Sequence, residues 1–294
     1  MINRNELSSL PFPTVWLPHS VENAVEYMKR FGEGARFISG GTLLQIQWEN
    51  GQRKPDHLIS LELISSLKEV HYLKDKRSLV IGALMPLAQL HKHPLIKNIH
   101  PIIGEAARFI ASPAVRTRGT IGGNIMGGIG DLIPLLLAME ASLLFITPNG
   151  EEKIVTWEWI KQAEKYKHAL LAQIMIPAMS EILHKNLFFK KLGRRESFTA
   201  AIVTVSGRFK KTDLDTVADV RLAAGGGDNN PFLLERTEEL LRGKKTEEID
   251  WKAIYRSICD EFIPVTDAFV TTDYRKKVAA NLIITELESR LYSI

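Results

Sequence analysis

A dense cluster of glycines constrains this chain more than any other feature of its sequence. Six of the 20 glycines lie within the twelve residues 119–130, and the apolar run 132–139 follows directly. Glycine allows backbones to approach closely and to adopt turns that other residues resist. The apolar run has no polar face, which predicts a deeply buried helix with Asp131 as its N-terminal cap. The cluster therefore predicts a tight turn at the mouth of a buried helix.

A second glycine turn lies in the sequence FISGGTLL, residues 37–44. Residues 35–39 predict a strand and residues 43–51 a short helix, so this turn joins a strand to a helix. Consecutive amides at such a turn can point at one anion. The turn lacks the lysine of a Walker A loop and the third glycine of a dinucleotide fingerprint, so neither of those nucleotide sites is predicted.

The larger cluster repeats the chemistry of the first turn. The sequence GTIGGN offers the Thr120 hydroxyl, the amides of Gly122 and Gly123, and the Asn124 side chain ahead of a helix. Two such turns can hold a pyrophosphate from opposite sides. Tight crossing of two loops would require the same glycines, so these residues alone leave a purely structural role open.

Periodic patterns organise the rest of the first half. Ser20 is placed to cap a helix whose apolar residues recur at helical spacing. The sequence SLLFITPNGEEKIVTW predicts a hairpin with Asn149 and Gly150 in a type I′ turn. Further strands are predicted at 57–61, 78–83 and 170–177, and helices over 84–94 and 100–111. The strand at 170–177 ends at Pro177, where we expect a domain boundary.

The last third of the chain has a different order of elements. Three long strands are predicted at 186–193, 200–211 and 216–226, and three helices near 232–242, 249–260 and 273–292. Strands followed by helices are typical of an α+β domain with an antiparallel sheet.

Composition argues against several classes of protein. The one cysteine, Cys259, cannot form an internal disulfide or supply the four thiolates of an ordinary iron–sulfur cluster. The net charge of +4 comes from basic residues scattered among acidic ones, whereas nucleic-acid binding favours a basic stripe. The apolar stretch 132–146 is too short for a membrane span, and residues 1–18 lack a signal-peptide pattern. We therefore expect a cytoplasmic protein with no membrane span and no nucleic-acid partner.

Two polar clusters are expected to carry no chemistry. His91 and His93 have no third metal ligand nearby, so no metal site is predicted. Glu196 beside Arg194 and Arg195 fits a salt-bridged strand end better than an acid or base. No catalytic residue is assigned.

Several of these segments together resemble the FAD-binding subunit of the molybdenum hydroxylases. The resemblance is carried by RFISGGTLLQIQWENGQRKPDHLISL, LVIGALMPLAQL, IASPAVRTRGTIGGNI and DLIPLLLAMEA. It continues through FFKKLGRRESFTAAIV, LAAGGGDNNPFLLERTEELLRGK and AFVTTDYRKKVAANL, so it covers essentially the whole chain. That family includes the flavoprotein subunit of bacterial xanthine dehydrogenases and the medium subunit of carbon monoxide dehydrogenases.

The resemblance implies a fold and its domains. An FAD-binding domain of p-cresol methylhydroxylase type, made of two α/β subdomains, would occupy residues 1–177, with subdomains at about 1–55 and 56–177. A C-terminal α+β domain would occupy residues 178–294.

The resemblance also implies the residues that bind FAD. Asp131 would contact the ribityl and adenosine side, Leu171 would supply an apolar contact, and Lys190 would lie near the flavin ring. Lys190 fits that lysine best when the arginine pair is matched, while Lys191 remains open. Two glycine turns would hold the pyrophosphate, through Ile38, Ser39, Gly40, Gly41, Thr42, Leu43 and Leu44, and through Thr120, Ile121, Gly122, Gly123 and Asn124. FAD would be noncovalent, because neither turn contains a histidine or cysteine.

The function that follows is electron transfer within a multi-subunit complex. Molybdopterin and [2Fe-2S] centres would lie on a molybdenum-binding subunit and an iron–sulfur subunit, and electrons would pass through FAD to NAD or another acceptor. Purines are the expected organic substrates of the complex, while carbon monoxide, nicotinate and aldehydes remain open.

Two departures from the family pattern keep alternatives open. Leu43 stands where relatives commonly have aspartate, and the loop 125–130 is shorter than theirs and lacks their serine and proline. A non-flavin assembly subunit of the same complex is one alternative. A stand-alone flavin reductase of the same fold is another.

Overall fold

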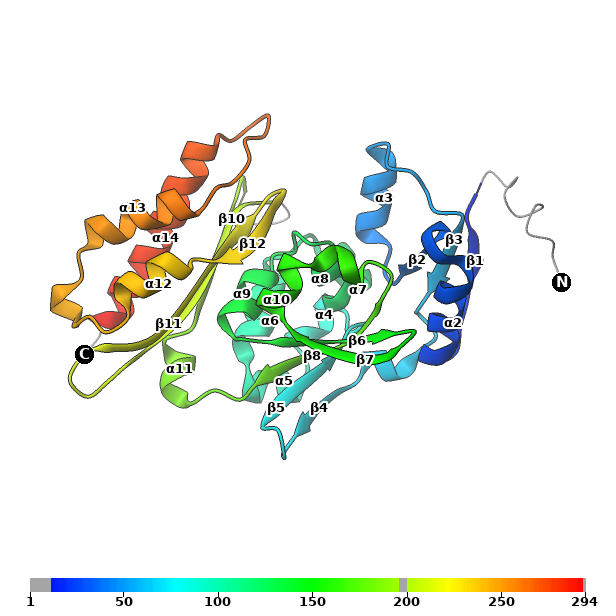
Figure 1. Cartoon of the computed structure of the whole chain (residues 1–294), viewed down its shortest axis with the longest axis horizontal. Coiled ribbons are helices and arrows are strands. Elements are labelled where there is room, and N and C mark those ends of the chain that lie inside the picture. Colours follow the sequence, from blue (N-terminus) through cyan, green and yellow to red (C-terminus); the bar gives the residue numbers. More distant parts are fainter. Residues whose placement is uncertain (1–11, 196–199, 293–294) are drawn as a thin grey trace.

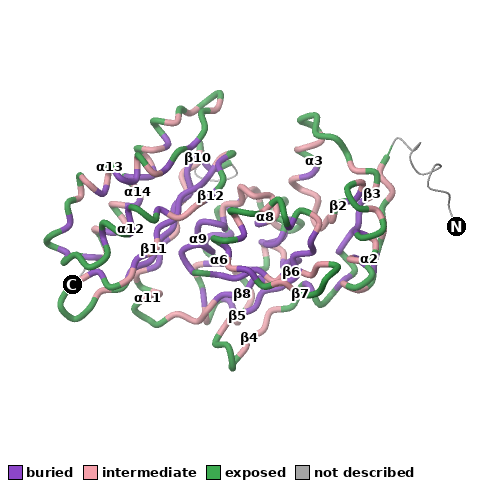
Figure 2. Tube along the Cα trace, viewed as in Figure 1, coloured by how far each residue is buried: buried purple, intermediate pink, exposed green. Residues whose placement is uncertain are grey.

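Three sheets follow one another along the chain, each with its own hydrophobic core (Figures 1 and 2). This is the arrangement in a computed structural model, which describes residues 12–195 and 200–292. The three sheets lie side by side in chain order, the first near the N-terminal end of the molecule and the third near the C-terminal end (Figure 1).

The first sheet has three parallel strands in the order β1-β3-β2. Ser20 caps α2 as predicted, because its hydroxyl accepts the Asn23 N–H. The helix then buries Ala24 and Met28 in the core of this sheet. The elements are β1 (Thr14–Trp16), α2 (Val21–Phe31), β2 (Ala35–Ile38), α3 (Thr42–Glu49) and β3 (His57–Ser60).

The second sheet has five strands in the order β4-β5-β8-β6-β7, and every neighbouring pair is antiparallel. Its strands are β4 (Val70–Leu73), β5 (Ser78–Gly82), β6 (Ser142–Thr147), β7 (Gly150–Val155) and β8 (Leu170–Pro177). The helices of this part are α4 (Leu87–Leu90), α5 (Pro94–Ile99), α6 (Pro101–Arg108), α7 (Pro113–Arg118), α8 (Ile121–Met126), α9 (Ile133–Ala138) and α10 (Thr156–Lys161).

The hairpin of β6 and β7 forms as predicted, but the predicted turn type is wrong. Thr147 pairs with Gly150, so Pro148 and Asn149 occupy the centre of the turn. A type I′ turn requires positive φ at both central residues, and the proline ring fixes φ near −65°. Gly150 instead takes the positive φ, at 120°.

The third sheet has four antiparallel strands in the order β12-β11-β10-β9, of which β12 was not predicted. Helix α14 packs on β10 from one side and α9 packs on β10 and β11 from the other. This double cover leaves nine successive residues of β10 buried. The elements are α11 (Glu181–Lys185), β9 (Phe188–Gly193), β10 (Ala201–Lys211), β11 (Val217–Gly226), β12 (Asn229–Leu233), α12 (Glu235–Leu241), α13 (Trp251–Glu261) and α14 (Thr272–Leu291).

Helix α9 is buried on all sides, as its apolar sequence predicted. Its end is tied to the third sheet by Glu140, whose carboxylate pairs with Arg208 at 2.6 Å and Arg221 at 3.1 Å. Arg208 is 5% exposed and also donates to the Ala138 carbonyl. Because a buried guanidinium needs such partners, this network fixes α9 against the third sheet.

Candidate functional site

The two glycine turns lie against each other. A Cβ added to Gly40 would lie 1.9 Å from the carbonyl oxygen of Arg118, so only glycine permits this approach. The Ser39 and Thr120 hydroxyls are 3.1 Å apart and hydrogen-bonded across the same contact. Turns separated by 81 residues in the sequence therefore form one structure.

The first turn leaves its backbone donors open. Gly41 is the N-terminal cap of α3, with a φ of 69°, and no side chain caps the helix. Among the described residues, the amides of Gly40, Gly41, Thr42 and Leu43 have no hydrogen-bond acceptor. Open amides at a helix N-terminus favour an anion.

The second turn uses its amides within the protein. Thr120 caps α8, and its hydroxyl accepts the Gly123 N–H at 3.0 Å. The Gly122 N–H donates to the Ala83 carbonyl at 2.8 Å. The expectation that the Gly122 and Gly123 amides face an anion is therefore wrong for this structure. Gly122 is required for packing instead, since its Cβ would lie 2.7 Å from that of Ala83.

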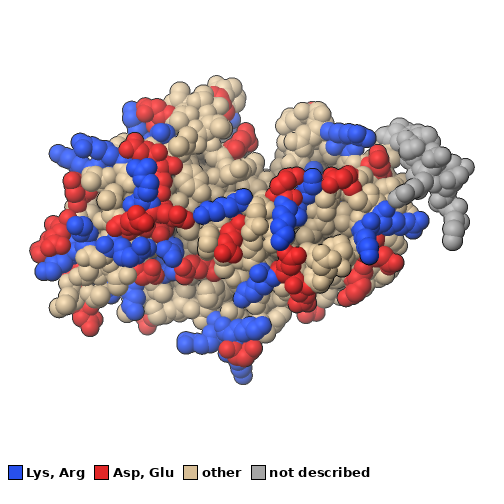
Figure 3. Space-filling view, viewed as in Figure 1, with Lys and Arg blue, Asp and Glu red and all other residues tan. Residues whose placement is uncertain are grey.

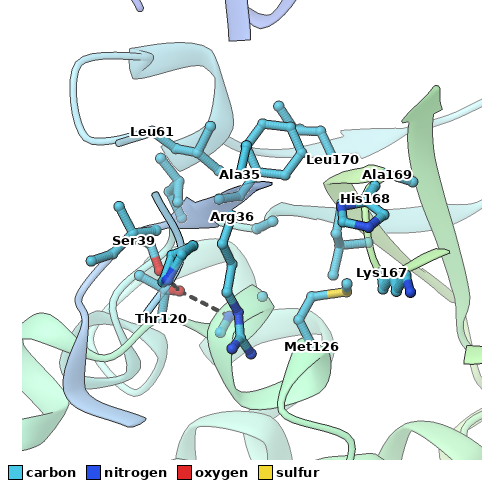
Figure 4. A pocket seen from close by; sticks show the side chains of 18 of the residues that line it. Ala35, Arg36, Ser39, Leu61, Thr120, Met126, Lys167, His168, Ala169 and Leu170 are labelled. Atoms are coloured by element: carbon cyan, nitrogen blue, oxygen red, sulfur yellow. Dashed lines mark hydrogen bonds between the residues drawn. The ribbon is translucent and has the colours of Figure 1, made fainter. Parts of the chain in front are cut away.

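Two pockets meet at the paired turns. The first has a volume of about 690 Å³ and the second about 510 Å³. Both are lined by Arg36, Ser39, Thr120, Gly123 and Met126, which we call the waist. Figure 4 shows the Ser39 and Thr120 side chains together at this point. Each volume lies in the usual range for small-ligand sites, so the pair suits a long ligand with two heads.

The two pockets differ in chemistry. The first is lined by more basic than acidic side chains, with Arg36, Arg53, Lys54 and Lys167 against Glu33 and Asp56, and by Leu170 and Leu171. The second is lined mainly by apolar residues such as Ile46, Ile110 and Ile129. It lies between α3 and the ends of β10 and β12, where Figure 3 shows a hollow bordered mainly by uncharged side chains.

Most of the predicted site residues line these pockets. Leu171 and Gly122 line the first pocket only. Ile121 is fully buried and lines neither pocket, and Lys190 also lines neither. Ile38, Ser39, Thr120 and Gly123 line both pockets, and Gly40, Gly41, Thr42, Leu43, Leu44, Asn124 and Asp131 line the second.

Asp131 does not cap the buried helix, and that prediction is wrong. The N-cap of α9 is Leu132, and no side chain caps the helix. The Asn124 side-chain oxygen accepts the Leu132 N–H at 3.2 Å, one residue before the helix begins. The Asp131 carboxylate instead accepts from Lys191 at 2.7 Å and from Thr204 at 2.9 Å. Both donors belong to the third sheet, which draws the carboxylate away from the helix.

The choice between Lys190 and Lys191 follows from strand alternation. Successive side chains of β9 point to opposite faces of the sheet. Lys190 pairs with Glu286 on α14, at 2.9 Å, on the face away from the pockets. Lys191 is 5% exposed in its side chain and pairs with Asp131 at the second pocket. Neither lysine lines a pocket, but Lys191 contacts the second pocket through Asp131, whereas Lys190, the better sequence match, does not.

Arg36 and Met126 were missed, although both line the waist. Strand alternation offered a signal for Arg36, because it shares a strand face with Ile38, which was predicted to be at the site. Thr204 was also missed, since its pairing with Lys191 depends on the register of β9 and β10.

The remaining polar clusters add no second site within residues 12–195 and 200–292. These residues contain no group of three or more His, Cys, Asp or Glu side chains arranged to hold a metal. Over the same ranges, no helix combines the length and apolar character needed to cross a membrane. Glu196, which was expected in a salt bridge, lies outside the described residues.

Two known domain families match the chain in succession. Residues 9–179 match the FAD binding domain in molybdopterin dehydrogenase. Residues 188–288 match the CO dehydrogenase flavoprotein C-terminal domain.

Individual proteins match over nearly the whole chain. The carbon monoxide dehydrogenase medium chain of Hydrogenophaga pseudoflava is 34% identical over 281 residues, covering 90% of this chain and 92% of the relative. The glyceraldehyde dehydrogenase medium chain of Sulfolobus acidocaldarius is 25% identical over 265 residues, covering 88% and 91%. A solved structure of the Hydrogenophaga pseudoflava carbon monoxide dehydrogenase superposes with a TM-score of 0.84 over 95% of this chain and 98% of that one, at 24% identity.

Proposed function

The chain belongs to the FAD-binding subunits of the molybdopterin dehydrogenases, and on that premise we propose that it passes electrons from a partner's iron–sulfur centres to an acceptor such as NAD. It is the flavoprotein component of an oxidoreductase complex. FAD supplies the redox chemistry when bound. The residues of this chain bind that cofactor, orient it and shield it from water.

The open amides of the first glycine turn support this proposal most directly. Gly40, Gly41, Thr42 and Leu43 present unpaired donors to the second pocket, directly after Ser39 at the waist, which suits a pyrophosphate between two ring systems. The Thr120 hydroxyl and the Asn124 side chain would complete the contacts, since the amides of the second turn are already bonded.

The chemistry of the pockets favours one orientation of FAD. The adenosine half would occupy the basic first pocket against Leu171. The isoalloxazine would occupy the more apolar second pocket, near the Lys191–Asp131 pair, so Asp131 would lie at the flavin end and not on the adenosine side that the resemblance implied. Lys191 rather than Lys190 would then be the cation nearer the ring, because Lys190 points to the opposite face of β9, where it pairs with Glu286 on α14.

Other subunits would carry the rest of the chemistry. One cysteine cannot bind an iron–sulfur cluster, so we place [2Fe-2S] centres on an iron–sulfur subunit and molybdopterin on a molybdenum-binding subunit. NAD, oxygen or a quinone would take the electrons from FAD. A purine substrate, as in a xanthine dehydrogenase, stays a prediction because the organic substrate would react on a partner chain.

The proposal is tested by purifying the chain alone and with its partners. The purified chain is expected to absorb at about 375 and 450 nm and to release one FAD per chain on denaturation. Iron and molybdenum should accompany it in a complex. A folded chain that binds no FAD would support the assembly subunit instead. An FAD-containing chain that reduces a substrate without partners would support the flavin reductase.

A further inference from the structure

Arg36 is the charged residue of the waist, where the two pockets share their lining. Its side chain extends from β2 into the space between Thr120 and Met126 (Figure 4). Among the described residues, its guanidinium has no hydrogen-bond or ion-pair partner. A cation thus stands unpaired beside the two glycine turns.

Two other basic side chains of the first pocket are already engaged, and a third, Arg53, does not line the waist. Lys167 pairs with Glu164 at 2.9 Å and with Glu33 at 3.4 Å. Lys54 lies over the Trp48 ring at 5.7 Å. Arg36 differs from both, and the surrounding protein lowers the pKa of its guanidinium by removing water from around it. The guanidinium has lost part of its hydration, and an anion bound at the waist would replace those lost interactions with water.

We infer that Arg36 binds the phosphoanhydride of FAD at the waist and neutralises charge that the glycine turns cannot. This inference rests on the proposed FAD function. The first turn offers neutral amides, and Ser39 and Thr120 offer neutral hydroxyls, so none of them balances a dianion. A guanidinium supplies both the charge and two parallel N–H donors that match a pair of phosphate oxygens. Arg36 therefore takes the part that a lysine plays in a P-loop, from the strand before the turn.

Ligands that carry different parts of FAD isolate this contact. ADP contains the adenosine and the phosphoanhydride, adenosine lacks the phosphates, and FAD contains all parts. We would titrate each into the full chain freed of cofactor, comparing wild type with Arg36→Gln and Arg36→Lys. Arg256→Gln removes the same charge from an exposed position on α13 and serves as the matched control. Circular dichroism of each sample verifies that the variants are folded.

The inference predicts a pattern across the three ligands. Arg36→Gln should weaken ADP and FAD binding by about 10- to 100-fold, the range for a lost charge-assisted hydrogen bond. Adenosine binding should be unchanged. Arg36→Lys should be intermediate, because lysine keeps the charge and loses the fork. Arg256→Gln should bind all three ligands as the wild type does.

The outcomes separate this inference from the function on which it rests. If the wild type binds FAD and Arg36→Gln binds it equally well, the inference is wrong and the proposed function stands. Equal weakening of adenosine and ADP would also overturn it, because the residue would then act on the adenosine end. If the folded wild-type chain binds no FAD, both proposals fall.

Discussion

Replacing Gly40 with alanine tests whether the two glycine turns must touch to form the site. The new Cβ would lie 1.9 Å from the carbonyl oxygen of Arg118 and 2.5 Å from its carbonyl carbon. Both are backbone atoms, so no side-chain rotation relieves the overlap. A carbon–oxygen contact needs about 3.3 Å, which requires the turns to separate by about 1.4 Å.

The cost of that separation can be estimated from two contributions. Overpacking of a tight contact costs about 1 to 3 kcal/mol. The hydrogen bond between Ser39 and Thr120, now 3.1 Å long, would also be broken, at a further cost of about 1 kcal/mol. We expect a total near 3 kcal/mol, which lowers the melting temperature of a chain this long by about 5 to 10 °C.

Thermal unfolding followed by circular dichroism measures this loss, and titration with FAD measures the effect on the site. We expect FAD affinity to fall by about tenfold or more, because the open amides would move away from Thr120. Gly34→Ala is the matched control for the melting measurement only, since its Cβ would meet only Asp56, at an ordinary 3.5 Å, but Gly34 lines the first pocket. A Gly40→Ala chain that melts with the wild type and binds FAD as tightly would refute the reasoning.

Three further predictions follow from the contacts around the site. Asp131→Asn and Lys191→Met should each lower the free energy of unfolding in urea by about 2 to 4 kcal/mol, because either change alone leaves a buried charge without its counter-ion. The double variant should lose much less than the sum of the two, and additive losses would contradict this. Lys190→Met should lower the free energy of unfolding by less than about 1 kcal/mol and leave the absorption of bound FAD unchanged, whereas Lys191→Met should shift that absorption. The reverse pattern would show that Lys190 is the lysine at the site. Burial and the neighbouring His184 lower the pKa of His100 from 6.5 to about 4, so the unfolded chain binds the extra proton between these values. Stability should therefore fall by up to about 3 kcal/mol as the pH drops through that window, and His100→Leu should flatten the dependence measured by urea unfolding.

Local patterns were sufficient for elements that are decided within a few residues. Helix α2 follows from the Ser20 cap and from apolar residues at helical spacing, and both appear in the structure. Strand β12 was missed because Pro231 lies within it and weakens a strand pattern. It forms at the edge of the third sheet, where pairing with β11 alone defines it. The hairpin turn was misassigned for a similar reason, since the register of β6 and β7 places Pro148 in its centre.

The functional site likewise has features that local sequence predicts and features that depend on distant residues. The two glycine turns could be found because close approach requires glycine at those positions. The amides that remain open could not be found, since the acceptors of the second turn, such as Ala83 and Met85, lie more than 30 residues away in the chain. The sequence also did not show which lysine of β9 points toward the site, because their partners, Glu286 and Asp131, lie on other elements of the chain.

The two departures from the family pattern prove to be neighbours in space. A Cβ on Gly127 would lie 2.7 Å from the Leu43 Cδ2, so the leucine occupies the space that a side chain at this loop position would need. One end of the short loop is held by Asn124, whose side-chain oxygen accepts the Leu132 N–H, and the other by Asp131, which pairs with the third sheet. Both Leu43 and the glycine loop line the second pocket. Leu43 therefore packs against the glycines of the short loop, and this contact explains how a shortened loop can still form a wall of the cleft.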